Sequence, residues 1–97
     1  MSTAQDIASE TRFYARLAEV ALKENPTTGY TWSLGLPRQL TLVKDAYVPD
    51  FPILAGSGGT HIFTLRSSEA GAFELTATLS RAGGEPEEKR IITVVFP

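Results

Sequence analysis

The chain has 97 residues, a formal net charge of −2 and no cysteine. Its length suits one domain with a single core, and its weakly acidic balance argues against nucleic acid or an anionic membrane surface as a partner. The lack of cysteine excludes a disulfide framework, a thiol nucleophile and a cysteine-based metal site.

Residues 1–11 are mostly polar and lack the basic start and apolar centre of a secretory signal. We expect them to form a flexible arm before a single domain over residues 12–97. We therefore expect a cytoplasmic location, or a periplasmic or secreted one if a signal has been removed. No segment approaches the ~18 apolar residues of a transmembrane helix.

Between residues 12 and 22, apolar and polar residues alternate with the period of a strand. The alternation slips in phase near Ala18, which predicts a bulge or a break between two short strands. Residues 15–23 also have a composition that favours a helix. The proline at position 26 and the β-rich remainder of the chain favour a strand.

The next segment combines residue types that stiffen a loop: Asn25-Pro26-Thr27-Thr28-Gly29-Tyr30. Proline fixes its own φ and restricts the residue before it, and the two threonines have few side-chain rotamers. Gly29 allows a backbone conformation that a Cβ would penalise. The pattern predicts a stiff projecting loop that fills a partner's cleft, or a rigid turn without a partner.

Further strands are predicted where apolar residues alternate again, over residues 30–34, 40–43, 47–48, 61–66, 73–79 and 91–96. Glycine and proline separate these runs, and residues 82–86 form a predicted hairpin loop. About seven short strands with regular turn signals indicate an all-β fold, an immunoglobulin-like β-sandwich. Trp32 fits the core of such a sandwich.

The candidates for catalytic chemistry are few. His61 is the only histidine, and its nearness in sequence to Ser57 and Asp50 is not evidence for a triad, which is defined by geometry. We expect His61 to be a half-exposed strand residue. The glycine-rich run after Ala55 lacks the Gly-Lys-Ser/Thr ending of a phosphate-binding loop, so it predicts close approach to another surface or a flexible hairpin tip. We expect no enzyme activity, no metal site and no cofactor.

The run from Asn25 to Tyr30, followed by Trp32, resembles the first binding loop of the chagasin-like inhibitors of cysteine peptidases. Gly56-Ser57-Gly58-Gly59-Thr60 resembles the second, glycine-rich loop of that family. The resemblance covers roughly residues 13–97. The third loop departs from it, because the family carries Arg-Pro-Trp where this chain has Arg81-Ala82-Gly83.

The resemblance implies a reversible, tight-binding competitive inhibitor of papain-like cysteine peptidases. The first loop would cover the catalytic Cys-His pair, the glycine-rich loop would follow the non-primed side, and Arg81 would reach the primed side. The implied peptidase-binding residues are Asn25, Pro26, Thr27, Thr28, Gly29, Tyr30, Gly56, Ser57, Gly58, Gly59 and Arg81. We expect a monomer when the protein is free. The altered third loop leaves an alternative: a non-inhibitory protein-interaction module.

Overall fold

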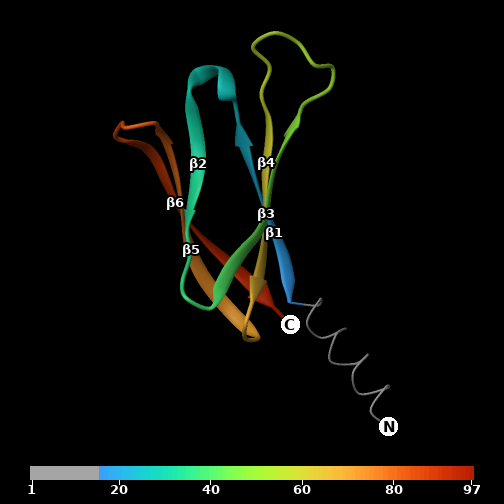
Figure 1. Cartoon of the computed structure of the whole chain (residues 1–97), viewed down its shortest axis with the longest axis vertical. Coiled ribbons are helices and arrows are strands. Elements are labelled where there is room, and N and C mark those ends of the chain that lie inside the picture. Colours follow the sequence, from blue (N-terminus) through green and yellow to red (C-terminus); the bar gives the residue numbers. More distant parts are fainter. Residues whose placement is uncertain (1–15) are drawn as a thin grey trace.

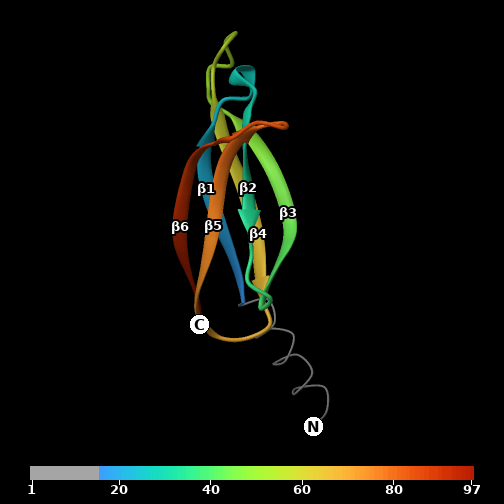
Figure 2. The same cartoon turned by 90° about the vertical axis from the view of Figure 1, so that its left-hand side faces the viewer.

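The computed structural model describes residues 16–97, which form two antiparallel three-stranded sheets packed face to face (Figures 1 and 2). One sheet has the strand order β1-β4-β3 and the other has the order β2-β5-β6. The elements are β1 (Leu17–Glu24), a one-turn 3-10 helix (Pro26–Thr28), β2 (Tyr30–Gly35), β3 (Leu40–Pro49), β4 (Gly59–Ser67), β5 (Gly71–Arg81) and β6 (Pro86–Phe96).

The hydrophobic core lies between the two sheets. Successive side chains of a strand point to opposite faces, so the alternating sequence turns one set of side chains inward from each sheet. Trp32 belongs to this set and is only 5% exposed, as its place in the pattern predicts. The buried apolar residues are Val20, Leu22, Trp32, Leu40, Phe63, Leu65, Leu75, Ala77, Val94 and Phe96.

Residues 40–49 form one strand where the sequence indicates two short ones, so residues 16–97 contain six strands rather than about seven. The strand register shifts between Leu42 and Lys44. This β-bulge lets a single strand continue across a change of alternation, because it turns the later side chains to the other face.

The stretch after Arg16 is a strand and not a helix. β1 pairs with β4 without a register shift, so the bulge predicted near Ala18 does not exist within β1. The reason is that β1 begins at Leu17, and its buried residues follow one phase from there. The earlier part of the alternating pattern and the predicted arm over residues 1–11 lie outside the described residues.

The strands alternate in direction, so the β1–β2, β3–β4 and β5–β6 connections lie at one end of the sandwich (Figure 1). The other two connections lie at the opposite end, where the described chain also begins. In residues 16–97, no helix has the length and apolarity needed to cross a membrane.

Candidate functional site

Three loops lie side by side at one end of the molecule, and we call them the first loop (residues 25–29), the second loop (residues 50–58) and the third loop (residues 82–85). Figure 1 shows the first loop in the middle, the second loop projecting furthest and the third loop set back. Loops held by a rigid sandwich are a common place for binding residues. The structure thus brings together the three segments that the sequence suggested.

The first loop is closed by hydrogen bonds among its own residues. Asn25 Oδ1 accepts a bond from the Thr27 backbone N–H at 3.1 Å and another from Thr27 Oγ1 at 2.6 Å. Thr28 Oγ1 donates to the Asn25 carbonyl oxygen at 2.7 Å. Pro26 occupies the first turn of the short helix, where a missing N–H costs nothing. The loop is therefore stiff because of its hydrogen bonds as well as its restricted rotamers.

Gly29 ends the helical turn with φ of 82°, in the left-handed region that glycine adopts without strain. Its N–H donates to the Pro26 carbonyl oxygen at 3.0 Å. The chain then enters β2 at Tyr30. This is the backbone role that the sequence predicted for Gly29.

The first and second loops are joined directly. Asn25 Nδ2 donates to the Gly56 carbonyl oxygen at 3.0 Å, and Lys23 Nζ lies 3.2 Å from Asp50 Oδ1 across the same gap. A depression of about 310 Å³ lies between the two loops, lined by Lys23, Glu24, Asn25, Asp50, Gly58 and Gly59. The two loops therefore present one continuous surface.

The glycine-rich segment has two parts with different environments. Gly56, Ser57 and Gly58 belong to the second loop, where Ser57 Oγ accepts a bond from the Leu54 N–H at 3.1 Å. Gly59 is instead the buried first residue of β4. A Cβ there would lie 2.6 Å from Tyr47 Oη, so packing requires this glycine. Direct contact of Gly59 with a peptidase stays a prediction.

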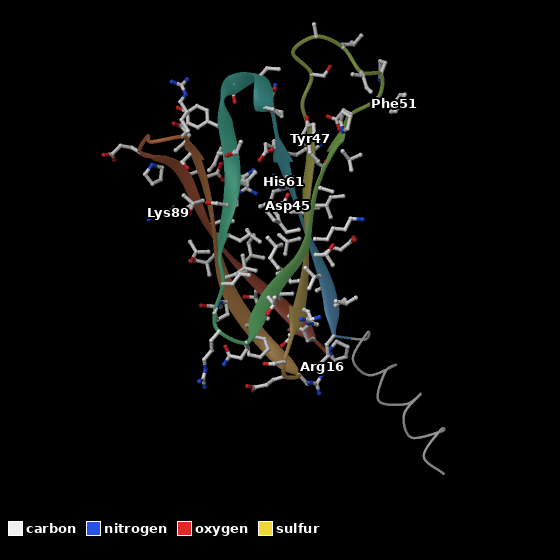
Figure 3. The ribbon with its side chains drawn as sticks, in the orientation of Figure 1. Arg16, Asp45, Tyr47, Phe51, His61 and Lys89 are labelled. Atoms are coloured by element: carbon white, nitrogen blue, oxygen red, sulfur yellow. The ribbon has the colours of Figure 1, made fainter. Side chains whose placement is uncertain are left out.

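The second loop also carries a group of exposed apolar side chains that sequence reasoning missed. Phe51 is 89% exposed, Ile53 is 63% exposed and Leu54 is 64% exposed. Figure 3 shows Phe51 pointing away from the body of the molecule. The signal in the sequence was an apolar run interrupted by Pro52. This run has no strand alternation, and it lies between a turn and a glycine-rich tip. Exposed apolar groups next to one another indicate an interaction surface.

Arg81, the last residue of β5, connects the base of the third loop to Tyr30, the residue that follows the first loop. The Arg81 guanidinium lies over the Tyr30 ring, 4.7 Å from its centroid, a geometry suited to a cation–π interaction. Ala82, Gly83, Gly84 and Glu85 are all exposed. Arg81 thus packs beside the first loop, while the third loop itself offers no large apolar side chain.

Three titratable side chains that sequence reasoning did not connect, Glu24, His61 and Asp45, contact one another. Figure 3 shows His61 and Asp45 near each other, below the loops. His61 Nδ1 is 2.9 Å from Glu24 Oε1, and His61 Nε2 contacts Asp45 Oδ1. His61 is partly buried, and its side chain is 13% exposed, so it is more covered than the half-exposed position expected from the sequence. It is covered because it lies on the same face of β4 as buried Phe63, whose ring stacks on it, and because Glu24 packs against it. We call this group the Glu24–His61–Asp45 bridge.

Burial lowers the pKa of His61, but hydrogen bonds and charge attraction from Glu24 and Asp45 outweigh it, so the pKa is raised above its usual value of 6.5. Ser57 and Asp50 bond elsewhere, to Leu54 and Lys23, so no serine triad is assembled with His61. Within the described part of the chain, no group of three or more His, Cys, Asp or Glu side chains is arranged to hold a metal ion.

Comparison with known families gives a match to the model of the chagasin family peptidase inhibitor I42 over residues 15–96. The chain belongs to this family. A search of curated proteins gave no match. Members of the chagasin family are peptidase inhibitors and not enzymes, which confirms the expectation that this chain has no enzyme activity.

Two solved structures share the fold. The crystal structure of the cysteine protease inhibitor EhICP2 from Entamoeba histolytica is 25% identical, with a TM-score of 0.67, over 84% of this chain and 78% of that one. The solution structure of amebosin is 28% identical, with a TM-score of 0.59, over 79% of this chain and 74% of that one. Together with the family match, they confirm the resemblance and the immunoglobulin-like sandwich predicted from the sequence.

Proposed function

We propose that this protein is a reversible, competitive inhibitor of papain-like cysteine peptidases. Its first loop covers the catalytic Cys-His pair, its second loop follows the non-primed side of the cleft, and Arg81 faces the primed side. Family membership supports inhibition of peptidases, and the name of EhICP2 supports the cysteine class. The observation that carries the proposal is the hydrogen-bonded first loop at the centre of the exposed edge.

A preformed loop favours tight binding because its ordering cost has been met before association. The Asn25 bond to Gly56 extends this order to the second loop. Inhibition would result from steric blocking, because the threonine hydroxyls of the first loop are bonded within it and are not positioned for covalent chemistry. Exposed Phe51, Ile53 and Leu54 would supply the apolar contact area of the interface.

The test is inhibition of papain by the purified protein. We expect reversible competitive inhibition without a time-dependent covalent phase, and no effect on serine peptidases or metallopeptidases. Thr28→Glu should weaken inhibition at least tenfold, because it places a large charge at the exposed tip of the first loop. Thr41→Glu is the matched control, since Thr41 is exposed at the start of β3, at the opposite end.

Full papain activity in a large excess of folded wild-type protein would contradict the proposal. So would equal inhibition by Thr28→Glu and the wild type. A second candidate function, a protein-interaction module without inhibitory activity, is favoured by one observation: the third loop has Ala82 and Gly83 where the family has an aromatic residue. The same papain assay separates the two functions.

A further inference from the structure

The Glu24–His61–Asp45 bridge connects the bases of the first and second loops. Glu24 is the last residue of β1 and directly precedes the first loop, while Asp45 lies on β3, the strand that leads into the second loop. His61 can reach both because β4 pairs with β1 on one side and with β3 on the other. The bulge after Leu42 sets the phase of β3 so that Asp45, and not Lys44, faces His61.

Glu24 also bonds to β2, the strand that follows the first loop. Its Oε1 accepts a hydrogen bond from the Trp32 backbone N–H at 2.8 Å, and Trp32 Nε1 donates to the Lys23 carbonyl oxygen at 2.7 Å. Glu24 and Trp32 belong to different sheets, so no ladder bond of one sheet joins them. The Glu24 carboxylate therefore links the residue before the first loop to Trp32 in the strand after it, and the same oxygen contacts His61.

Both ring nitrogens of His61 face carboxylate oxygens. A neutral imidazole has one N–H, so only the imidazolium can donate to both. The Asp45 side chain is 50% exposed and can be hydrated, whereas the Glu24 side chain is 4% exposed. When His61 loses a proton, the remaining N–H should stay on Glu24, and the contact with Asp45 should be lost.

Among the groups packed around His61, the two carboxylates account for its preference for the charged form. Carboxylates approach it from β1 and β3, Tyr47 is its register partner on β3, and the Phe63 ring stacks on it with centroids 4.1 Å apart. From the opposite sheet, Trp32 bonds to Glu24, and the Arg90 guanidinium of β6 lies 5.2 Å from the centroid of the Trp32 ring. The two nearby carboxylates raise the pKa of His61 despite burial.

We propose that the His61 imidazolium is a positioning residue that holds the first and second loops at the spacing that a cysteine peptidase binds, and that its deprotonation weakens this binding. The proposal rests on the proposed function. His61 acts through Glu24 and Asp45 and touches no peptidase atom itself. By linkage, peptidase binding should raise the affinity of His61 for its proton by the same factor.

The first experiment follows the free protein by NMR across pH 5 to 9. The chain has one histidine and one tryptophan, so the His61 ring and the Trp32 indole each give one set of signals. We expect the amide signals of Gly29 and Trp32, and that of Gly56 in the second loop, to shift with the same midpoint as the His61 ring. Amide signals that do not shift as His61 titrates would overturn the proposal.

A pair of matched variants tests the cause of this coupling. Asp45→Asn should lower the midpoint of the His61 titration, because it removes one of the two carboxylates that stabilise the imidazolium. Glu74→Gln should leave the midpoint unchanged, since Glu74 is exposed on β5 and pairs with Thr93, away from the bridge. An unchanged midpoint in Asp45→Asn would overturn the assigned contact.

The second experiment measures the Kd for a papain-like peptidase at each pH for the wild type, Asp45→Asn and His61→Gln. The ratio of variant to wild type at each pH cancels the titration of the enzyme itself. We expect the wild-type Kd to rise about fivefold or more through the His61 titration relative to His61→Gln, on the scale of ordinary coupling between sites. Asp45→Asn should show the rise at lower pH.

Parallel pH profiles for all three proteins would overturn the proposal even if they all inhibit. If the wild type does not bind the enzyme, the proposed function fails. The NMR coupling between His61 and Gly29 then decides separately whether the bridge positions the first loop. Asp45 is half exposed, so we expect Asp45→Asn to fold. Comparison of Asp45→Asn with the wild type therefore still tests the proposal if His61→Gln does not fold.

Discussion

Thr28 and Gly29 are neighbours at the exposed end of the first loop, but they act on it in different ways. Thr28 contributes a side-chain hydrogen bond to Asn25, and Gly29 contributes a backbone conformation. The hydrogen bond could be replaced by water, because the loop is exposed. The conformation at Gly29 cannot be replaced, since every L side chain is strained there.

We expect Gly29→Val to weaken peptidase inhibition at least tenfold and to lower the free energy of unfolding by only about 1–2 kcal/mol, the scale of one strained backbone position. Urea unfolding and inhibition constants measure the two effects. Gly35→Val is the control, because Gly35 lies in the strand region of β2 and its nearest neighbour to an added Cβ is 3.7 Å away. Equal inhibition by the two variants would show that the shape of the first loop does not control binding.

At the scale of elements, the second and third loops contribute differently to the exposed edge. The second loop projects furthest and carries exposed Phe51, Ile53 and Leu54. The third loop is set back and made of small and acidic residues. Interface energy concentrates in a few residues, and aromatic residues are enriched at interfaces. We therefore expect the second loop, with Phe51, to contribute more binding energy than the third loop.

The triple variant Phe51→Ser/Ile53→Ser/Leu54→Ser should weaken peptidase binding about 30-fold or more, since losing one strong anchor costs ~2 kcal/mol. Its free energy of unfolding should change little, because these side chains are exposed. Ile91→Ser/Val95→Ser is the control, as Ile91 and Val95 on β6 are 64% and 67% exposed. Sedimentation of each protein shows whether the second loop joins two copies of the chain. A dimer in the wild type that is lost in the triple variant would contradict the role of the second loop in binding a peptidase.

Restoring the family sequence in the third loop should strengthen binding to a papain-like enzyme only in part. Gly83 has φ of 70°, so a tryptophan placed there by Ala82→Pro/Gly83→Trp is strained. We expect this double variant to slow dissociation from a papain-like enzyme by less than the about 30-fold that a well-placed aromatic anchor provides. A gain of 30-fold or more would show that the hairpin adopts a new shape. An unchanged rate would show that the third loop lies outside the interface.

At the scale of the whole molecule, the Glu24–His61–Asp45 bridge links folding to pH. The pKa of His61 is raised in the folded state, so the folded chain holds this proton more tightly than the unfolded chain. The resulting stability is fully present below the unfolded pKa of about 6.5 and is lost as the pH rises through the folded pKa.

We therefore expect the free energy of unfolding to decrease as the pH rises above about 6.5, with a slope of at most ~1.4 kcal/mol per pH unit from this group. Urea unfolding of the wild type at pH 6 and pH 9 measures the decrease. Asp45→Asn should reduce it and Glu74→Gln should not. A stability that rises over this range in the wild type alone would contradict the role assigned to His61.

The sequence by itself determined the properties that depend on neighbouring residues. The β-sandwich was predictable because strand alternation and turn residues are local signals, as in the run over residues 73–79. The first loop was predictable for the same reason, since Pro26 and Gly29 act on their own backbone dihedrals. The length of β3 was not, because a bulge depends on the partner strand as well as on the bulged one.

Only the tertiary structure decided which distant residues meet. Glu24 and His61 are 37 positions apart, and His61 and Asp45 are 16 positions apart. Their contact depends on strand register and on the bulge in β3, which no local pattern encodes. The packing of Arg81 on Tyr30 and the exposure of Phe51 likewise follow from how the strands pair and where the loops project. Side-chain chemistry was visible in the sequence, but strand pairing determined which groups share a proton or a surface.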